Sequence, residues 1–182
     1  MRSAQADERL ETIATVNGEE RRFSVAPRVS LADALRGELG LAGVRSGCEH
    51  GICGACTILV DGKAMRACLM LGIQAHGRDI RTVEGLGTAG QLAPLQEAFR
   101  RHHALQCGFC TSGMLASAQA LLDENPAPTR EEAREAMSGN LCRCTGYQTI
   151  IDAVMDEAAR RIAERDGAIP SDTSPEAEKA HG

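Results

Sequence analysis

The sequence contains few aromatic residues and no excess of positive charge. Its 182 residues include no Trp, one Tyr and three Phe, and 25 acidic residues outnumber 20 Lys and Arg, so the net charge is −5. Proteins that bind single-stranded nucleic acid stack bases on aromatic side chains, and proteins that bind duplexes or anionic membranes present basic surfaces. The composition therefore argues against nucleic acid and anionic membranes as partners.

Long apolar runs and an export signal are also lacking. No run approaches the roughly 18 to 20 apolar residues of a membrane span. The first residues, MRSAQADERLETIATV, carry acidic side chains where a signal peptide has an apolar stretch, so we expect a cytoplasmic protein. A hydrophobic content of 43% with 25% charged residues is typical of a folded globular protein. Cysteines in the cytosol rarely form disulfides, so the eight cysteines need another explanation.

The first half of the chain has the residue pattern of a small α+β domain. Asn17-Gly18 lies between two β-prone runs, and both residues tolerate the positive φ of a two-residue hairpin turn. Ser30 can cap a short helix that ends near Gly40. Three further strands are predicted, at Thr57–Val60, Ala64–Leu71 and Ile80–Val83. We therefore expect one domain over residues 10–84.

From residue 91 onward the apolar spacing changes from two to about 3.6 residues, the period of an α-helix. Four short helices are predicted, two of them opening with capping boxes at Thr129 and Thr145, and they fit a four-helix bundle over residues 91–164. Residues 85–90 match G-x-G-x-x-G, but the strand and acidic residue of a dinucleotide site do not follow, so a linker is predicted. Residues 165–182 lose periodicity, which predicts a flexible tail.

Four cysteines lie in the first domain. Cys48, Cys53, Cys56 and Cys68 are separated by four, two and eleven residues, and the first three have the spacing of a plant-type [2Fe-2S] ferredoxin. Glycines in SGCEHGICGAC let the loop curl so that backbone N–H groups approach the cluster sulfurs. Zinc also takes four thiolates, but more often as two separated Cys-x2-Cys pairs. His50 has no second Rieske-type partner and is interpreted as a loop residue.

The other four cysteines form a second set in the helical half. Cys107, Cys110, Cys142 and Cys144 are separated by two, 31 and one residues. Cys107-Gly-Phe-Cys110 alone resembles a thioredoxin-like motif, but the preceding segment is helical and the other two cysteines would have no role. The two cysteine pairs each lie at the start of a predicted helix, where the free backbone N–H groups favour a negatively charged cluster. A second [2Fe-2S] cluster is therefore predicted. No catalytic residues are identified, because no Ser/His/Asp set or carboxylate pair has supporting context.

These motifs resemble a known family. The segments GCEHGICGACTILVDG, ACLML, QCGFCTSGM and NLCRCTGYQTI are similar to the iron-sulfur subunit of the molybdenum hydroxylases, the xanthine dehydrogenase family that includes carbon monoxide dehydrogenase and aldehyde oxidoreductases. The resemblance covers residues 10–163. It implies an N-terminal β-grasp domain like plant ferredoxin and a C-terminal four-helix bundle, each with one [2Fe-2S] cluster on the cysteine set named above.

The resemblance also implies an electron-transfer role in a larger enzyme, with no substrate site on this chain. A large partner subunit would hold molybdenum and a pyranopterin cytosine dinucleotide or related cofactor, and a medium subunit would hold FAD, in a heterotrimer or a dimer of heterotrimers. Electrons would pass from molybdenum through the bundle cluster and then the ferredoxin-like cluster to FAD or another acceptor. Gln106 would hydrogen-bond the pterin, and Cys144 would be the ligand closest to the pterin amino group.

Two alternatives share part of these features. A free-standing ferredoxin-like carrier would need the first cysteine set but not Gln106 beside Cys107. A zinc-stabilised interaction module would use the cysteines without any redox chemistry.

Metal analysis separates these hypotheses. After anaerobic purification we expect about four irons per chain, inorganic sulfide, and two distinct EPR signals upon reduction. Zinc in place of iron would contradict the redox interpretation.

Overall fold

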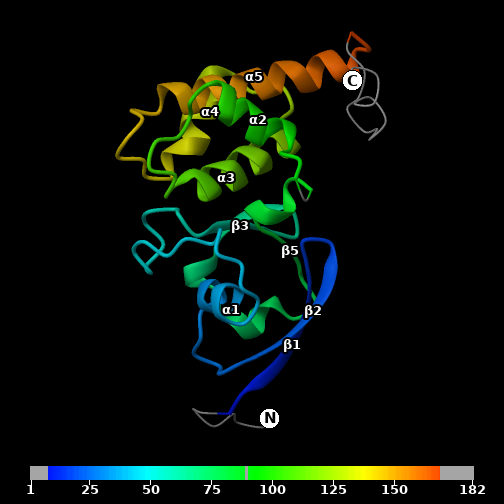
Figure 1. The fold of residues 1–182 in the computed structure, drawn as a ribbon, viewed down its shortest axis with the longest axis vertical. Helices are drawn as coiled ribbons and strands as arrows, with labels where there is room; N and C mark the ends of the chain where they lie inside the picture. The colour runs from blue at the N-terminus through cyan, green and yellow to red at the C-terminus, as the bar shows by residue number, and fades with distance from the viewer. Residues whose placement is uncertain (1–7, 89, 169–182) are drawn as a thin grey trace.

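A computed structural model describes residues 8–88 and 90–168, which form two units stacked along the long axis of the molecule (Figure 1). The lower unit in this view is a mixed sheet with one α-helix, and the upper unit consists of four α-helices, so the chain is an α+β protein. The tail predicted from residue 165 lies outside the described residues beyond residue 168, as does residue 89 of the predicted linker. Within the described part, no helix is long and apolar enough to cross a membrane.

The sheet has five strands in the order β2-β1-β5-β3-β4. The strands are β1 (Leu10–Val16), β2 (Glu19–Val25), β3 (Thr57–Val60), β4 (Lys63–Arg66) and β5 (Asp79–Arg81). β1 and β2 form the predicted hairpin, in which Asn17 and Gly18 turn with φ of 53° and 82°. β5 runs parallel to β1 and antiparallel to β3, so it joins the two hairpins into one sheet.

Helix α1 (Leu31–Gly37) packs in the core of this lower unit. Ser30 caps it as predicted, because its hydroxyl accepts the backbone N–H of Asp33 at 3.1 Å and satisfies one of the unpaired donors of the first turn. The helix ends at Gly37 rather than near Gly40. Its buried face contributes Leu31 and Leu35 to a hydrophobic core shared with the strands.

The predicted strand Ala64–Leu71 is only partly correct. β4 ends at Arg66, and two short 3-10 helices follow, η1 (Ala67–Leu69) and η2 (Gly72–Ala75). The chain leaves the sheet here because Cys68 turns toward Cys56, which it contacts through its side chain. A third 3-10 helix, η3 (Val83–Gly85), follows β5 where the linker was predicted to begin.

The upper unit contains α2 (Pro94–Arg101), α3 (Thr111–Glu124), α4 (Arg130–Ser138) and α5 (Gln148–Arg165). These helices share a second hydrophobic core, in which Phe99, Met114 and Met137 are almost completely buried. Thr129 caps α4 as predicted, with its hydroxyl accepting the N–H of Glu132 at 3.2 Å.

The predicted capping box at Thr145 is wrong. The residue before α5 is Tyr147, which has a left-handed backbone (φ 68°) and makes no side-chain cap. The Thr145 hydroxyl instead lies 3.1 Å from the sulfur of Cys142 and accepts the N–H of Tyr147 at 3.2 Å. The hydroxyl is therefore engaged with the cysteine loop rather than with the helix.

Replacing Phe99 with Ala should destabilise the helical unit. The ring is 1% exposed, and the cavity left behind is expected to lower the free energy of unfolding by about 3–5 kcal/mol. Urea denaturation followed by circular dichroism measures this change. Leu92→Ala is the control, because Leu92 is 45% exposed and its truncation should change the free energy of unfolding by about 0.5 kcal/mol or less.

Candidate metal centres

The structure brings the four cysteines of the first set together. Cys48, Cys53 and Cys56 lie in the loop between α1 and β3, and Cys68 reaches this loop from η1. The backbone N–H of Cys53 points at the sulfur of Cys48, at 3.3 Å. The Cys68 side chain lies beside that of Cys56 and within electrostatic range of Cys48.

Backbone donors and burial act differently on the thiols of this set. The N–H of Cys53, assisted by that of His50, lowers the pKa of Cys48 to about 6, because these donors stabilise a thiolate. Burial raises the pKa of Cys68, and the neighbouring Cys56 adds to the effect. Cys48 is therefore biased toward the thiolate, and Cys68 is biased toward the neutral thiol.

The second set also converges. The sulfurs of Cys107 and Cys144 lie 3.6 Å apart, and the side chain of Cys110 lies beside that of Cys142. All four line a hollow of about 210 Å³, together with neighbouring residues of the same two loops. Figure 1 shows these loops, before α3 and before α5, on the same side of the view as the cyan loop of the first set.

The pKa shifts of the four thiols in the second set also differ in direction. Burial, with Cys142 beside it, raises the pKa of Cys110 to about 12. Burial also opposes ionisation of Cys142, but hydrogen bonds from Thr145 outweigh it and lower the pKa of Cys142. The N–H of Phe109 lowers the pKa of Cys107, whereas the hydrogen bond with Cys107 raises the pKa of Cys144.

The cysteine contacts fit a binuclear cluster. The side-chain contacts divide the second set into two pairs, Cys107 with Cys144 and Cys110 with Cys142. In the first set Cys68 neighbours Cys56, while the sulfur of Cys48 accepts the backbone N–H of Cys53. Four thiolates in two pairs are what the two irons of a [2Fe-2S] cluster require.

Unpaired hydroxyl groups support this fit at the second set. The hydroxyl oxygens of Thr111 and Ser112 are buried without a hydrogen-bond partner, directly after Cys110. Buried donors of this kind normally have an acceptor, and the sulfides of a cluster are acceptors. The residues present therefore fit a [2Fe-2S] group at both sets.

Three supporting residues were missed by the sequence analysis: Asn140, Tyr147 and Arg66. The hydroxyl of Tyr147 accepts the N–H of Cys142 at 2.8 Å and donates to the carbonyl of Asn140 at 3.0 Å. Arg66 donates to the carbonyl of Gly139 and so connects the end of β4 to the second cysteine loop. The segment NLCRCTGY contains two of these residues, but a motif of this kind indicates ligands and not the residues that brace them.

Gln106, predicted to contact a pterin, lies at the mouth of the second set. Its side-chain amide donates to the carbonyl of Cys144 at 3.1 Å and is otherwise exposed. The bond ties the segment before Cys107 to the loop that carries Cys144.

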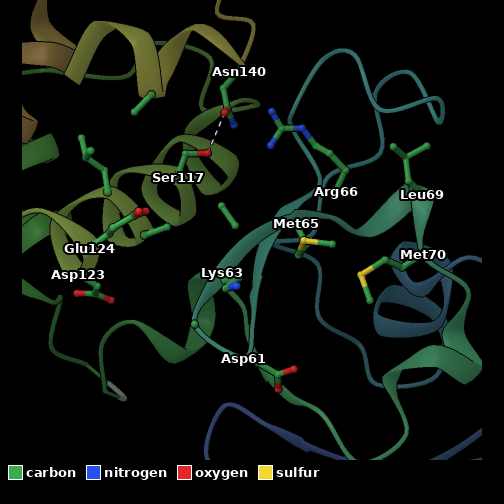
Figure 2. A pocket seen from close by; sticks show the side chains of 15 residues that line it. Asp61, Lys63, Met65, Arg66, Leu69, Met70, Ser117, Asp123, Glu124 and Asn140 are labelled. Atoms are coloured by element: carbon green, nitrogen blue, oxygen red, sulfur yellow. Dashed lines mark hydrogen bonds between the residues drawn. The ribbon is translucent and has the colours of Figure 1, made fainter. Parts of the chain in front are cut away.

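A larger groove of about 1210 Å³ lies between β4 and α3 (Figure 2). No cysteine or histidine lines it. Two of its carboxylates are already paired, Asp61 with Arg78 and Asp123 with Arg161. The groove therefore offers no metal-ligand set comparable with the two cysteine sets.

Two sets of four paired cysteines, with hydrogen-bond donors around them, define an iron-sulfur electron-transfer protein with two clusters. Family comparison agrees, because a "2Fe-2S iron-sulfur cluster binding domain" matches residues 14–78 and a "[2Fe-2S] binding domain" matches residues 82–155. The chain belongs to the family of [2Fe-2S] subunits of the molybdenum hydroxylases, the xanthine dehydrogenase family.

Individual relatives support this membership. The nicotine 6-hydroxylase small subunit of Paenarthrobacter nicotinovorans is 58% identical over 167 residues, which cover 92% of this chain and all of the relative. Quinoline 2-oxidoreductase of Pseudomonas putida 86 contains a chain with 60% identity and a TM-score of 0.83, covering 88% of this chain and 99% of that chain. The aldehyde oxidoreductase of Megalodesulfovibrio gigas is 47% identical over 82% of this chain, which is 17% of its own length.

Removing one ligand of the second set should remove one of the two clusters. Cys144→Ser takes away a sulfur that lies 3.6 Å from Cys107, so iron is expected to fall from about four to about two per chain. Iron analysis and EPR of the reduced protein measure the change, and the signal of the first set should remain. Cys48→Ser is the mirror-image control, and an equal loss of both signals in either variant would mean that the two sites do not form independently.

Proposed function

We propose that this chain relays electrons within a molybdenum hydroxylase, from a molybdenum-pyranopterin cofactor on a large partner subunit to FAD on a medium partner subunit. A [2Fe-2S] cluster supplies a site that accepts and releases one electron. The observation that carries the proposal is that both cysteine sets lie in loops joined by a direct hydrogen bond, from the N–H of Leu141 to the carbonyl of Cys53 at 2.9 Å.

Exposed apolar side chains beside each set support docking of partner chains around the cysteine loops. Leu105, Phe109 and Leu141 are 42%, 46% and 56% exposed and lie within two residues of the second set. Ile52 and Leu69, both 63% exposed, lie next to Cys53 and Cys68 of the first set. Exposed apolar groups of this size mark interfaces, because their burial against a partner is favourable.

We assign the molybdenum subunit to the surface of the second set. Cys107, Cys144 and Gln106 are all exposed there, so a pterin bound by the partner could reach them directly. By the family pattern, Gln106 would hydrogen-bond that pterin and Cys144 would be the nearest ligand. The medium subunit with FAD would then dock at Ile52 and Leu69.

The domain organisation we propose follows the two hydrophobic cores. A β-grasp domain of the plant-ferredoxin type spans residues 10–84, a linker spans 85–90, and a four-helix bundle spans 91–164. We further propose a cytoplasmic heterotrimer, or a dimer of heterotrimers.

The names of relatives favour one substrate class for the complex. The matched chains of the nicotine, caffeine and quinoline enzymes are 53–60% identical to this chain, those of a nicotinate and a xanthine dehydrogenase are 49% and 46% identical, and those of the aldehyde oxidoreductases are 44–48% identical. Nicotine, caffeine and quinoline are nitrogen heterocycles. We therefore propose that the large partner subunit oxidises a nitrogen-heterocyclic aromatic compound, while this chain contributes no substrate contact.

Co-expression with candidate large and medium subunits from the same organism tests the function. We expect all three chains to co-purify, and anaerobic addition of a nitrogen heterocycle such as nicotine or quinoline to bleach the visible absorbance of both clusters. Aliphatic and aromatic aldehydes should bleach them more slowly. Cys144→Ser in the same complex should prevent the substrate from reducing the remaining cluster, because the electrons enter at the second set.

A chain that holds both clusters but recruits neither partner would favour the free-standing carrier. Faster reduction by aldehydes than by heterocycles would contradict the substrate class and leave the relay intact.

A further inference from the structure

Asn140 is a polar side chain that is fully buried where the two units meet. Its exposed fraction is 0%, and it lies two residues before Cys142 in the second cysteine loop. Figure 2 shows its carboxamide pointing toward Ser117 on α3, with the hydrogen bond drawn as a dashed line. Burial of an amide is unfavourable unless its donors and acceptors are paired, so its partners show what it holds.

The partners of Asn140 come from both units. Its Oδ1 accepts the hydroxyl of Ser117 at 2.8 Å. Its Nδ2 donates to the carbonyl oxygen of Gly54 at 3.0 Å and lies 3.3 Å from the hydroxyl oxygen of Thr57. Gly54 and Thr57 flank Cys56, and Ser117 lies on the helix that starts after Cys110. A single carboxamide therefore joins the first cysteine loop, helix α3 and the second cysteine loop.

Neighbouring contacts leave these loops little freedom. The N–H of Leu141 donates to the carbonyl of Cys53 at 2.9 Å, and Arg66 donates to the carbonyl of Gly139. A Cβ atom on Gly54, which has φ of +74°, would lie 2.6 Å from the carbonyl oxygen of Gly139. Backbones that approach this closely need an interaction that fixes their orientation, and Asn140 lies within this contact.

We propose that Asn140 is a positioning residue that fixes the separation and orientation of the two cysteine loops, and so sets the electronic coupling between the two cluster sites. The inference rests on the proposed relay between these sites. An asparagine suits the role because its amide offers a donor and an acceptor on opposite sides, whereas Asp offers acceptors alone and would face the oxygens of Gly54 and Thr57. Hydrophobic residues would leave the Gly54 carbonyl and Ser117 hydroxyl without this partner.

Asn140→Ala in the full-length protein with both clusters tests this role. We expect each reduced cluster to keep its own EPR signal and its iron, while the magnetic interaction between the two reduced clusters is weakened or lost. Hydrogen exchange of peptides covering residues 53–57 and 139–142 should accelerate about fivefold to tenfold relative to the β1–β2 hairpin, because buried hydrogen bonds that restrain local opening are removed. A general loss of stability would accelerate exchange in the hairpin as well.

Asn125→Ala is the matched control. Asn125 lies between α3 and α4, where its side chain accepts the N–H of Ala127 at 3.1 Å, so the same substitution there should leave the spin interaction unchanged. Ser117→Ala is the milder second variant, because it removes one hydrogen bond to Oδ1 of Asn140. It should change the spin interaction in the same direction as Asn140→Ala but by less.

The outcomes separate this inference from the relay. The test uses whichever of the Asn140 and Ser117 variants retains both clusters. If that variant shows the wild-type magnetic interaction and the wild-type hydrogen exchange in both loops, the positioning role is overturned and the relay is not. A wild-type chain that binds no iron overturns the relay, and the positioning role with it.

Discussion

Close backbone contact between the first cysteine loop and the helical unit is the constraint on which both cysteine sites depend. A Cβ atom on Gly113, in the first turn of α3, would overlap the carbonyl oxygen of Gly54. Glycine at position 113 lets the helix approach the first cysteine loop, and glycine at position 54 lets that loop approach Gly139 and Asn140. Cys53 and Cys56 belong to the loop on one side of this contact, and Cys110 lies directly before the helix on the other side. The geometry of one cysteine site is therefore coupled to that of the other.

Local signals in the sequence predicted local structure well. Asn17-Gly18, Ser30 and Thr129 act within one turn of chain, so a hairpin and two helix starts could be predicted from them. The wrong predictions lie beside cysteines. The strand after Arg66 stops because Cys68 faces another loop, and Thr145 does not cap α5 because its hydroxyl is engaged with Cys142 and Tyr147. Long-range demands of the cysteine sites override local propensity at both places.

Cysteine spacing predicted which side chains come together, since the spacing of each set matches a known cluster motif even where its members lie in different loops. The same spacing contains no information about Asn140, whose amide contacts Gly54 across 86 residues of sequence. Such a partner depends on how the two units pack against each other, and this packing is set by shape rather than by periodicity. The differences in pKa among the cysteines had no sequence signal either. Backbone N–H groups lower the pKa of Cys48, and burial raises that of Cys110, and both causes depend on the folded structure.

The hydrogen bond between Leu141 and Cys53 is made entirely by main-chain atoms. Apart from proline at position 141, no amino-acid replacement can delete its donor, and none can delete its acceptor, since every residue carries a carbonyl group. An alanine scan would therefore pass over the most direct connection between the two loops. Substitutions can change the side-chain amides, hydroxyls and rings that surround this bond, but they leave its donor and acceptor in place because both belong to the backbone.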